Sequence, residues 1–242
     1  MRIGIFSDVH GNVEALEVVL KALEEERVDG SFCLGDLVGY GPNPNQCVEK
    51  VMQFSDRVVA GNHDHAATGQ TPTTYFNEYA RMAIDWTRKV LSSNSMINLN
   101  RLPVVLIEGE ITLVHATPDE PEAWHYIFTY ADARRSFGVL KTPLCFVGHS
   151  HAPGAFVRNE EGEIFTHNPT EITLEEGKTY IINVGSVGQP RDGDPRASYG
   201  ILDTEERRFQ LKRLTYPVKV VQEKMWRENL PPALIDRLSF GQ

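Results

Sequence analysis

Residues 3–12 read IGIFSDVHGN, and this stretch decides the fold class. Its apolar run over 3–6 predicts a buried strand, and Asn12 predicts the N-cap of a helix whose apolar residues recur at helical spacing up to Arg27. Asp8 and His10 lie between the two elements, at the carboxyl end of the strand. Because open α/β sheets place their binding sites at this end of their strands, the segment predicts an α/β fold with a site directly after the first strand.

The same arrangement returns at four more places along the chain. Each is a short apolar run that predicts a buried strand and that ends in side chains able to bind a metal. The strand ends are Gly35-Asp36 after 31–34, Gly61-Asn62-His63-Asp64 after 57–60, His115 after 111–114, and Gly148-His149-Ser150-His151 after 144–147. Five strands therefore deliver a carboxylate, an amide or an imidazole to what we expect to be one rim.

The spacing and chemistry of these residues indicate a metal site. In an extended chain, residues i and i+2 point to the same side, so Asp8 with His10 and His149 with His151 can each aim two side chains in one direction. Neutral imidazole together with carboxylate and amide oxygens suits intermediate ions such as Mn²⁺, Fe²⁺, Ni²⁺ or Zn²⁺. Cysteine is missing from the set, which argues against a structural zinc site.

The rest of the chain predicts further helices and an antiparallel part. Helices are expected at 46–54, 76–91, 130–140 and 218–228, and a hairpin at 103–107 and 111–114. Beyond residue 150, strands are expected at 154–158, 163–167, 180–184, 197–203 and 208–214. On the 76–91 helix, the stripe expected to face the core consists of Tyr79, Met82, Ala83, Trp86 and Val90. We expect a single domain over residues 1–242.

Composition and charge exclude several classes of protein. Hydrophobic residues make up 41% and charged residues 24% of the chain, which excludes a wholly disordered protein. The net charge of −9 argues against broad nucleic-acid binding, so a phosphorylated ligand needs metal ions or local cations. The three cysteines form no CxxC pair and indicate a reducing compartment. Because no signal peptide or long apolar run is found, we expect a cytoplasmic protein with no membrane partner, and the oligomeric state is left open.

The ordered set of motifs resembles the calcineurin-like metallophosphoesterase superfamily. DVH at 8–10, GD at 35–36, GNHD at 61–64, His115 and GHSH at 148–151 occur in the family's order. The longer phrases SDVHGN, GDLVGYGP and INVGSVGQPRDGD resemble its small bacterial and archaeal phosphodiesterase branch. The resemblance implies an α/β fold that forms a four-layer α/β/β/α sandwich with two divalent metal ions at its rim.

The resemblance also implies a role for each motif residue. The implied ligands of one ion are Asp8, His10 and His151, those of the other are Asn62, His115 and His149, and the implied bridge is Asp36. His63 matches the family's catalytic histidine, and we expect it to donate a proton to the leaving oxygen. The expected reaction is hydrolysis of a small phosphodiester by a hydroxide that bridges the two cations.

Two positions depart from the protein-phosphatase branch of the superfamily. That branch continues GD with xVDRG, whereas this chain reads LVGYG at 37–41. Gly39 therefore stands where that branch has the Asp that supports the catalytic histidine, and Tyr40 stands where it has a phosphate-binding Arg. The departure argues against a protein phosphatase and leaves open what orients His63. A phosphomonoesterase, and a catalytically weak scaffold for protein partners, are the alternatives to a phosphodiesterase.

Four more polar residues carry open alternatives. Asp64 either orients His63 or caps a helix. Arg191 either binds a phosphate of the substrate or forms a surface ion pair with an aspartate of its own loop. His65 and His125 either contact the substrate or are ordinary polar residues of their segments.

Overall fold

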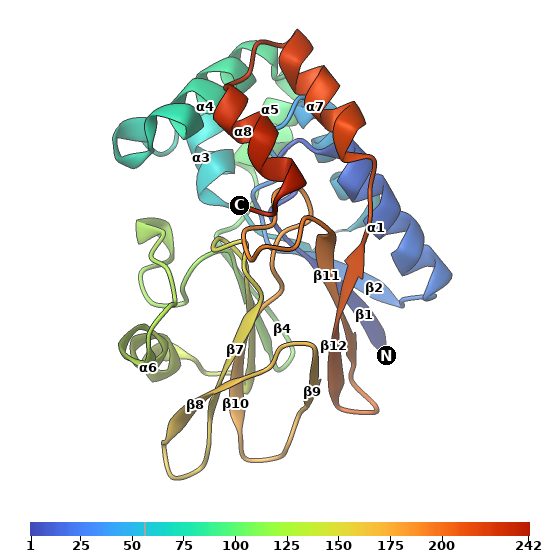
Figure 1. Cartoon of the computed structure of the whole chain (residues 1–242). Coiled ribbons are helices and arrows are strands. Elements are labelled where there is room, and N and C mark those ends of the chain that lie inside the picture. The colour runs from blue at the N-terminus through green and yellow to red at the C-terminus, as the bar shows by residue number, and fades with distance from the viewer. Residues whose placement is uncertain (56) are drawn as a thin grey trace.

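Two mixed six-stranded sheets form the centre of the protein (Figure 1). The computed structural model describes residues 1–55 and 57–242. The first sheet has the order β3-β2-β1-β11-β12-β9, with β1 (Arg2–Phe6), β2 (Gly30–Cys33), β3 (Arg57–Val58), β9 (Glu171–Thr173), β11 (Ala197–Asp203) and β12 (Arg208–Leu214). The second has the order β4-β5-β6-β10-β7-β8, with β4 (Val105–Glu108), β5 (Ile111–Val114), β6 (Leu144–Val147), β7 (Gly154–Arg158), β8 (Ile164–His167) and β10 (Thr179–Asn183).

Helices cover the outer faces of the two sheets unequally (Figure 1). On the outer face of the second sheet, α6 (Tyr130–Val139) packs through Ala133 and Phe137. The outer face of the first sheet shares its core with α1 (Val13–Glu25), α2 (Pro44–Phe54), α3 (Asn62–Thr68), α4 (Glu78–Val90), α5 (Ser93–Asn100), α7 (Val218–Arg227) and α8 (Pro232–Asp236). The layers therefore run helix, sheet, sheet, helix, and the predicted α/β/β/α sandwich is confirmed. Among the described residues, no helix has the length and apolar character needed to cross a membrane.

The core between the sheets explains the continuous apolar run of β1. Ile3 and Ile5 belong to the core between the two sheets, whereas Phe6 belongs to the core under the helices. Successive side chains of a strand point to opposite faces, so a strand buried on both faces needs apolar residues throughout. Across the inter-sheet core, the rings of Phe146 and Phe209 lie with their centroids 5.5 Å apart. These contacts fix the two sheets against each other.

Strand direction brings the predicted site residues to one edge. In the first sheet, β1, β2 and β3 are parallel neighbours. In the second, β5, β6 and β10 are parallel neighbours. The carboxyl ends of parallel strands meet at the same edge of a sheet, so the loops that follow β1, β2, β3, β5 and β6 converge. The late strands β11 and β12 are not an appendage, because β11 pairs antiparallel with β1 inside the first sheet.

The stripe expected to be buried on the 76–91 helix is wrong in part, because Ala83 is buried and Trp86 packs against the core, but the other three residues are exposed. On α4, Tyr79 and Met82 are 48% and 49% exposed. The buried residues of α4 are Ala80, Ala83, Ile84 and Thr87. The buried face is thus offset by one residue from the expected stripe and carries mainly small side chains. Residue size pointed to the wrong face, because large apolar residues are common on protein surfaces.

The two faces of α4 make a matched test of this correction. Ile84→Ala should lower the free energy of unfolding by about 2–5 kcal/mol, because the substitution leaves a cavity in the core. Met82→Ala removes an exposed side chain from the same helix and should change it by less than about 0.5 kcal/mol. Urea denaturation followed by circular dichroism measures both values. Equal losses for the two variants would contradict the orientation of α4.

Candidate metal centre

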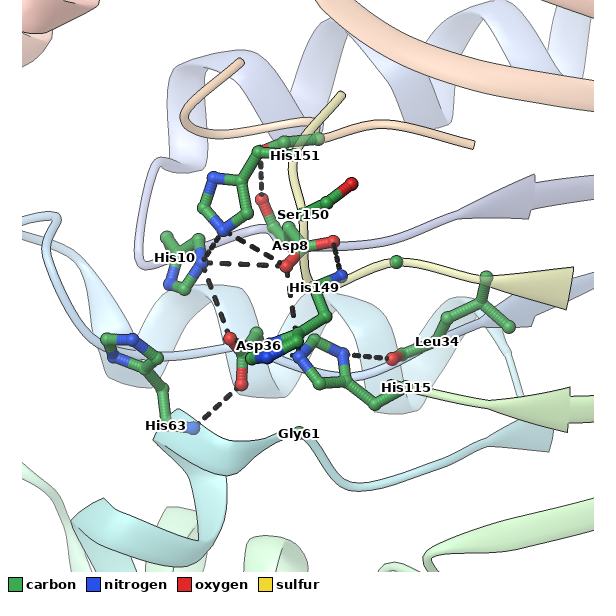
Figure 2. A network of polar contacts seen from close by, with 12 residues as sticks. Asp8, His10, Leu34, Asp36, Gly61, His63, His115, His149, Ser150 and His151 are labelled. Carbon is green, nitrogen blue, oxygen red and sulfur yellow. Dashed lines mark hydrogen bonds and ion pairs between the residues drawn. The ribbon is translucent and has the colours of Figure 1, made fainter. Parts of the chain in front are cut away.

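The loops after β1, β2, β5 and β6 bring six of the predicted metal-binding side chains together (Figure 2), and the seventh, Asn62, lines the same cavity as Asp36. Two groups have ligand atoms that all lie within 4.8 Å of one another. The first consists of Asp8, His10, Asp36 and His151, and the second of Asp36, His115 and His149. All of these residues are buried, and Asp36 belongs to both groups. Their role as metal ligands stays a prediction, while their convergence is a property of the fold.

The backbone that carries these residues is left-handed, not extended. The φ angles are positive at five of the residues in the two groups: Asp8 (55°), His10 (50°), Asp36 (52°), His149 (67°) and His151 (60°). Residues other than glycine rarely adopt this conformation, and it concentrates at functional sites where the surrounding packing enforces it. The prediction that extended i, i+2 spacing aligns the side chains was therefore wrong in its geometry. Asp8 and His10 do lie in one group, but His149 and His151 join different groups.

Each carboxylate is held by a backbone amide on one oxygen. The His63 N–H donates to Asp36 Oδ1 at 2.8 Å, and the His149 N–H donates to Asp8 Oδ2 at 3.1 Å. The other oxygens face the histidines, since Asp8 Oδ1 lies 3.2 Å from His151 Nε2. Asp36 Oδ2 lies 3.5 Å from His10 Nε2 and 3.3 Å from His115 Nε2. The amides thus fix the rotation of both carboxylates and leave one oxygen of each for the cluster.

The histidines are oriented by main-chain carbonyl groups. In every ring of the two groups, one nitrogen lies at hydrogen-bond distance from such an oxygen. The pairs are His10 Nδ1 with Val38 (3.0 Å), His115 Nδ1 with Leu34 (2.7 Å), His151 Nδ1 with Gln189 (2.6 Å) and His149 Nε2 with Trp124 (2.8 Å). A carbonyl only accepts, so that nitrogen carries the proton and the other nitrogen of the neutral ring presents a lone pair to the cluster.

The donor set fits divalent cations. His10 Nε2 and His151 Nε2 lie 3.0 Å apart, and the tautomers fixed by the carbonyls point two lone pairs at each other. Such an arrangement is repulsive unless a positive charge lies between the nitrogens. Within residues 1–55 and 57–242, the buried atoms Asp8 Oδ1, Asn62 Oδ1 and His115 Nε2 have no hydrogen-bond partner. Buried polar atoms without partners are costly, and divalent cations can supply the missing partners.

The charges of the cluster are those of a metal-binding site. Burial opposes ionisation of Asp36, but His115 and His63 hold the pKa of Asp36 well below its ordinary value. Burial lowers the pKa of His149 to about 4, and burial together with Arg191 lowers the pKa of His151 to about 3. Near neutral pH, the cluster therefore contains an ionised Asp36 carboxylate and the neutral rings of His149 and His151, which are the protonation states that metal ligands require.

His63 lies beside the two groups without joining either. Its ring centroid is 4.8 Å from that of His10, 4.4 Å from that of Tyr40 and 4.9 Å from that of Phe76. Among the described residues, its Nδ1 has no hydrogen-bond partner. A Cβ atom added to Gly39 would collide with this nitrogen, so the structure has no room for the Asp of protein phosphatases. Packing against aromatic rings, rather than a carboxylate, orients His63.

Asp64 serves as a cap, which decides its open alternatives. Its carboxylate accepts hydrogen bonds from the amides of Gly61 (3.0 Å), Leu37 (2.9 Å) and Val38 (3.3 Å). The first of these bonds caps α3, and the other two hold the loop that carries Asp36. Asp64 therefore ties together the segments that deliver Asn62 and Asp36, and none of its hydrogen bonds within the described parts of the chain goes to the His63 ring.

A cavity of about 400 Å³ opens in front of the cluster. Its walls include Arg191, His125 and the aromatic rings of Phe76, Trp124 and Tyr126. Tyr126 stacks on His149 with ring centroids 4.2 Å apart. His65, by contrast, is buried outside the cavity and packs edge-on against Trp124.

Sequence reasoning missed three elements of this region: Tyr126, the carbonyl of Trp124 and Gln189. The first two lie in a segment without a recognisable motif. Gln189 does lie within the phrase INVGSVGQPRDGD, but the resemblance of this phrase to the phosphodiesterase branch gives the residue no role. Nothing in the residue type of Trp124 could have shown that its carbonyl orients a histidine, because every residue has that group.

The aspartates of the 189–196 loop form ion pairs with arginines other than Arg191. Asp192 pairs with Arg213, and Asp194 pairs with Arg196 at 2.6 Å. Arg191 instead donates to Gln189 Oε1 at 2.9 Å. The alternative of a surface ion pair between Arg191 and a loop aspartate is thus not what the structure contains.

The fold and the cluster agree with comparisons to known proteins. The model of the calcineurin-like phosphoesterase superfamily domain matches residues 1–207. The chain belongs to this superfamily. A metallophosphoesterase from Sphaerobacter thermophilus is 41% identical and superposes with a TM-score of 0.87 over 100% of this chain and 99% of that chain. Because the family match ends at residue 207, the single domain over 1–242 stays a prediction.

Two relatives add to this assignment. An uncharacterised protein from Methanocaldococcus jannaschii is 42% identical over 99% of this chain and 98% of that protein. Phosphodiesterase YfcE of Escherichia coli (strain K12) is 25% identical over 85% of this chain and 89% of its own length. Together with the buried cluster of histidine and aspartate side chains, family membership indicates that this protein binds divalent metal.

Metal binding should release protons. Burial disfavours the charged ring of His115, but Asp36 and Asp8 raise the pKa of His115 to about 9, so this ring is protonated at pH 7 without metal. A ligand nitrogen must be unprotonated, so a cation has to displace this proton. The apparent affinity for Mn²⁺ should rise by about tenfold per pH unit and level off above about pH 9.

Calorimetric titration in buffers of different ionisation enthalpy measures the number of protons released. His167→Gln replaces an exposed histidine of β8 and should leave that number unchanged. Binding of Mn²⁺ near pH 7 without proton release would contradict a role for His115 as a ligand.

Proposed function

We propose that this protein is a phosphodiesterase that uses two metal ions. The observation that carries the proposal is the position of Asp36 Oδ2, which lies 3.5 Å from His10 Nε2 and 3.3 Å from His115 Nε2. One carboxylate oxygen thus faces a histidine from each of the two groups, as expected for a ligand common to adjacent cations. Membership of the phosphoesterase superfamily supports hydrolysis, and the similarity to phosphodiesterase YfcE supports phosphodiesters as substrates.

The proposed ligand sets follow the two groups, with Asn62 added to the second because its buried Oδ1 has no hydrogen-bond partner among the described residues. The residues that would hold the cations are Asp8, His10 and His151 for one, Asn62, His115 and His149 for the other, and Asp36 for both. When bound, the cations would supply positive charge to the phosphoryl oxygens and lower the pKa of a water so that it can attack phosphorus. The chain's own contribution is to fix the ligand rings through main-chain carbonyls and to keep the cluster buried.

His63 would supply the proton for the leaving oxygen. Its ring lies next to His10 and lines the cavity, so it can reach a bound ester without being a ligand. Burial holds the pKa of His63 well below its ordinary value in the absence of substrate. The negative charge of a bound phosphate favours the imidazolium, so substrate binding would help to place the proton on this ring.

Arg191 would bind a phosphoryl oxygen. Its guanidinium lines the cavity together with Asp36, His63 and His151. It lies over the ring of Tyr40, 5.5 Å from the centroid. A planar guanidinium in this place can donate two hydrogen bonds to a phosphate. This side chain would therefore do the work that a protein phosphatase assigns to the arginine replaced here by Tyr40.

The proposal also names a metal ion, Mn²⁺, and a compartment, the cytoplasm. We take Mn²⁺ as the first ion to test, because the proposed ligands combine nitrogen and oxygen atoms without a thiolate. Cys33, Cys47 and Cys145 are buried and free, which fits the reducing cytoplasm.

The substrate class can be tested with two artificial substrates. In the presence of Mn²⁺, we expect kcat/KM for bis(4-nitrophenyl) phosphate to exceed that for a phosphoserine peptide, because Gly39 and Tyr40 replace the protein-phosphatase residues. Asp36→Asn removes the charge shared by both groups and should abolish both activities. A higher kcat/KM for the phosphopeptide would overturn the preference for diesters. No turnover of either ester would favour the scaffold.

The role of His63 can be tested through the leaving group. His63→Ala should keep the metal content of the protein and lower kcat by about 10²–10⁴-fold for a diester with a poor alkoxide leaving group. A nitrophenolate leaves without a proton, so the loss for an aryl diester should be much smaller. Elemental analysis of the purified variant controls for metal content. Equal losses for both leaving groups would mean that His63 positions the phosphate instead.

A further inference from the structure

We infer that Arg237 positions Arg191 for phosphate binding, through the side-chain oxygen of Gln189 that both guanidinium groups share. Arg191 Nη2 donates to Gln189 Oε1 at 2.9 Å, and Arg237 Nη1 donates to the same atom at 3.2 Å. This inference rests on the proposed function, because it takes Arg191 as the residue that binds the phosphoryl group. It assigns a role to the C-terminal segment, which lies beyond residues 1–207 of the family match.

Gln189 connects the metal centre with the two arginines. It is 1% exposed, and its backbone amide donates to Ser186 Oγ at 2.8 Å. Its main-chain carbonyl lies 2.6 Å from His151 Nδ1, while its side-chain oxygen accepts from Arg191 and Arg237. The residue thus fixes a predicted ligand through its main chain and a predicted substrate-binding residue through its side chain. The contact to Arg191 therefore uses a different atom of Gln189 from the contact to His151.

The charges of the two arginines are not compensated by the protein. Among the described residues, no carboxylate oxygen lies within 4.0 Å of either guanidinium, and the loop aspartates pair with Arg213 and Arg196 instead. Arg191 Nε is buried and has no hydrogen-bond partner in the described parts of the chain. A buried donor of a charged group that lacks an acceptor is costly. An anion in the adjacent cavity can supply that acceptor, and Arg237 keeps the guanidinium of Arg191 in place to meet it.

The C-terminal segment is itself held firmly. The short helix η3 (Arg237–Ser239) follows α8, and Leu234, Ile235 and Leu238 are buried in the core under the helices. A second contact ties this segment to the same loop, because the Gly193 N–H donates to the Gly241 carbonyl at 2.9 Å. Arg237 is therefore attached to a packed element at its backbone and to the Arg191 loop at its tip, which is the arrangement that a positioning residue needs.

Two measurements on the Mn²⁺-loaded protein test the inference. Calorimetry gives the dissociation constant of inorganic phosphate, and steady-state kinetics with an aryl phosphodiester separates KM from kcat. Arg191→Met should weaken phosphate binding and raise KM by about 10- to 100-fold. Arg237→Met should weaken phosphate binding and raise KM by about fivefold, with kcat changed less than twofold. Arg227→Met removes a 74% exposed arginine of α7 and should change neither quantity.

The double variant separates positioning from a direct effect. In the Arg191→Met background, Arg237→Met should have no further effect, because the group that it positions is gone. The same fivefold change in both backgrounds would show that Arg237 acts on the anion directly, and this would overturn the inference. Arg237→Lys keeps the charge with a single donor and should fall between the wild type and Arg237→Met. If the Arg237→Met variant does not fold, Arg237→Lys provides the test. A phosphate dissociation constant and a KM equal to those of the wild type for Arg237→Lys would then overturn the inference.

The outcomes also separate this inference from the proposed function. Phosphate binding is measured without turnover, so an inactive protein still tests the arginines. If Arg191→Met binds phosphate as tightly as the wild type, the substrate-binding role of Arg191 fails and the inference fails with it. If Arg191→Met weakens binding and neither Arg237 variant does, the proposed function stands and only the inference is overturned.

Discussion

Two carboxylates buried side by side are the constraint on which the rest of this structure depends. Asp8 and Asp36 are at most 1% exposed, and both lie within 4.0 Å of the Nε2 atoms of His10 and His115. Removing two negative charges from water costs several kcal/mol for each unless positive charge and hydrogen bonds compensate. Backbone amides satisfy one oxygen of each carboxylate. The histidines alone do not fully compensate the negative charge on the other oxygens. A divalent cation is the compensation that fits the remaining donor atoms. The loops, turns and tautomers around the cluster are consequences of that requirement.

The sandwich stabilises the strained conformations of the loops, because it fixes the strands at the ends of these loops. β1 is buried on both faces, and the inter-sheet core locks the strands from which the loops emerge. Left-handed backbone at a residue other than glycine costs on the order of 1–3 kcal/mol and persists only where packing enforces it. Close approach adds a second demand, since a Cβ atom at Gly61 would collide with the carboxylate of Asp36. The rigid sheets therefore hold the loops in place, and the loops in turn fix the positions of the donor atoms.

Sequence reasoning identified the side chains of the site but not the contacts that orient them. The apolar runs and their polar ends predicted β1, β5 and β6 and the convergence of Asp8, Asp36 and His115. The face of α4 was misassigned in part, because the large side chains of Tyr79 and Met82 suggested burial, whereas the smaller Ala80 and Thr87 are buried in their place. The three-residue strand β9 is too short for a periodic signal. The main-chain carbonyl groups that orient the histidines cannot be recognised in the sequence, because every residue has one. The bond between Arg237 and Gln189 spans 48 positions, which no local pattern reports.

The main-chain anchoring of the histidines has a consequence for how this protein can change over evolutionary time. Val38, Leu34, Trp124 and Gln189 orient the rings with their carbonyl oxygens, so replacing any of these side chains leaves the anchoring atom in place. Mutation can therefore alter the walls around the centre while the centre itself is inherited unchanged. Trp124 and Gln189 are examples, because the side chain of one lines the cavity and that of the other holds Arg191. Substitutions can in this way change which ligands fit the cavity while the positions of the histidines are kept.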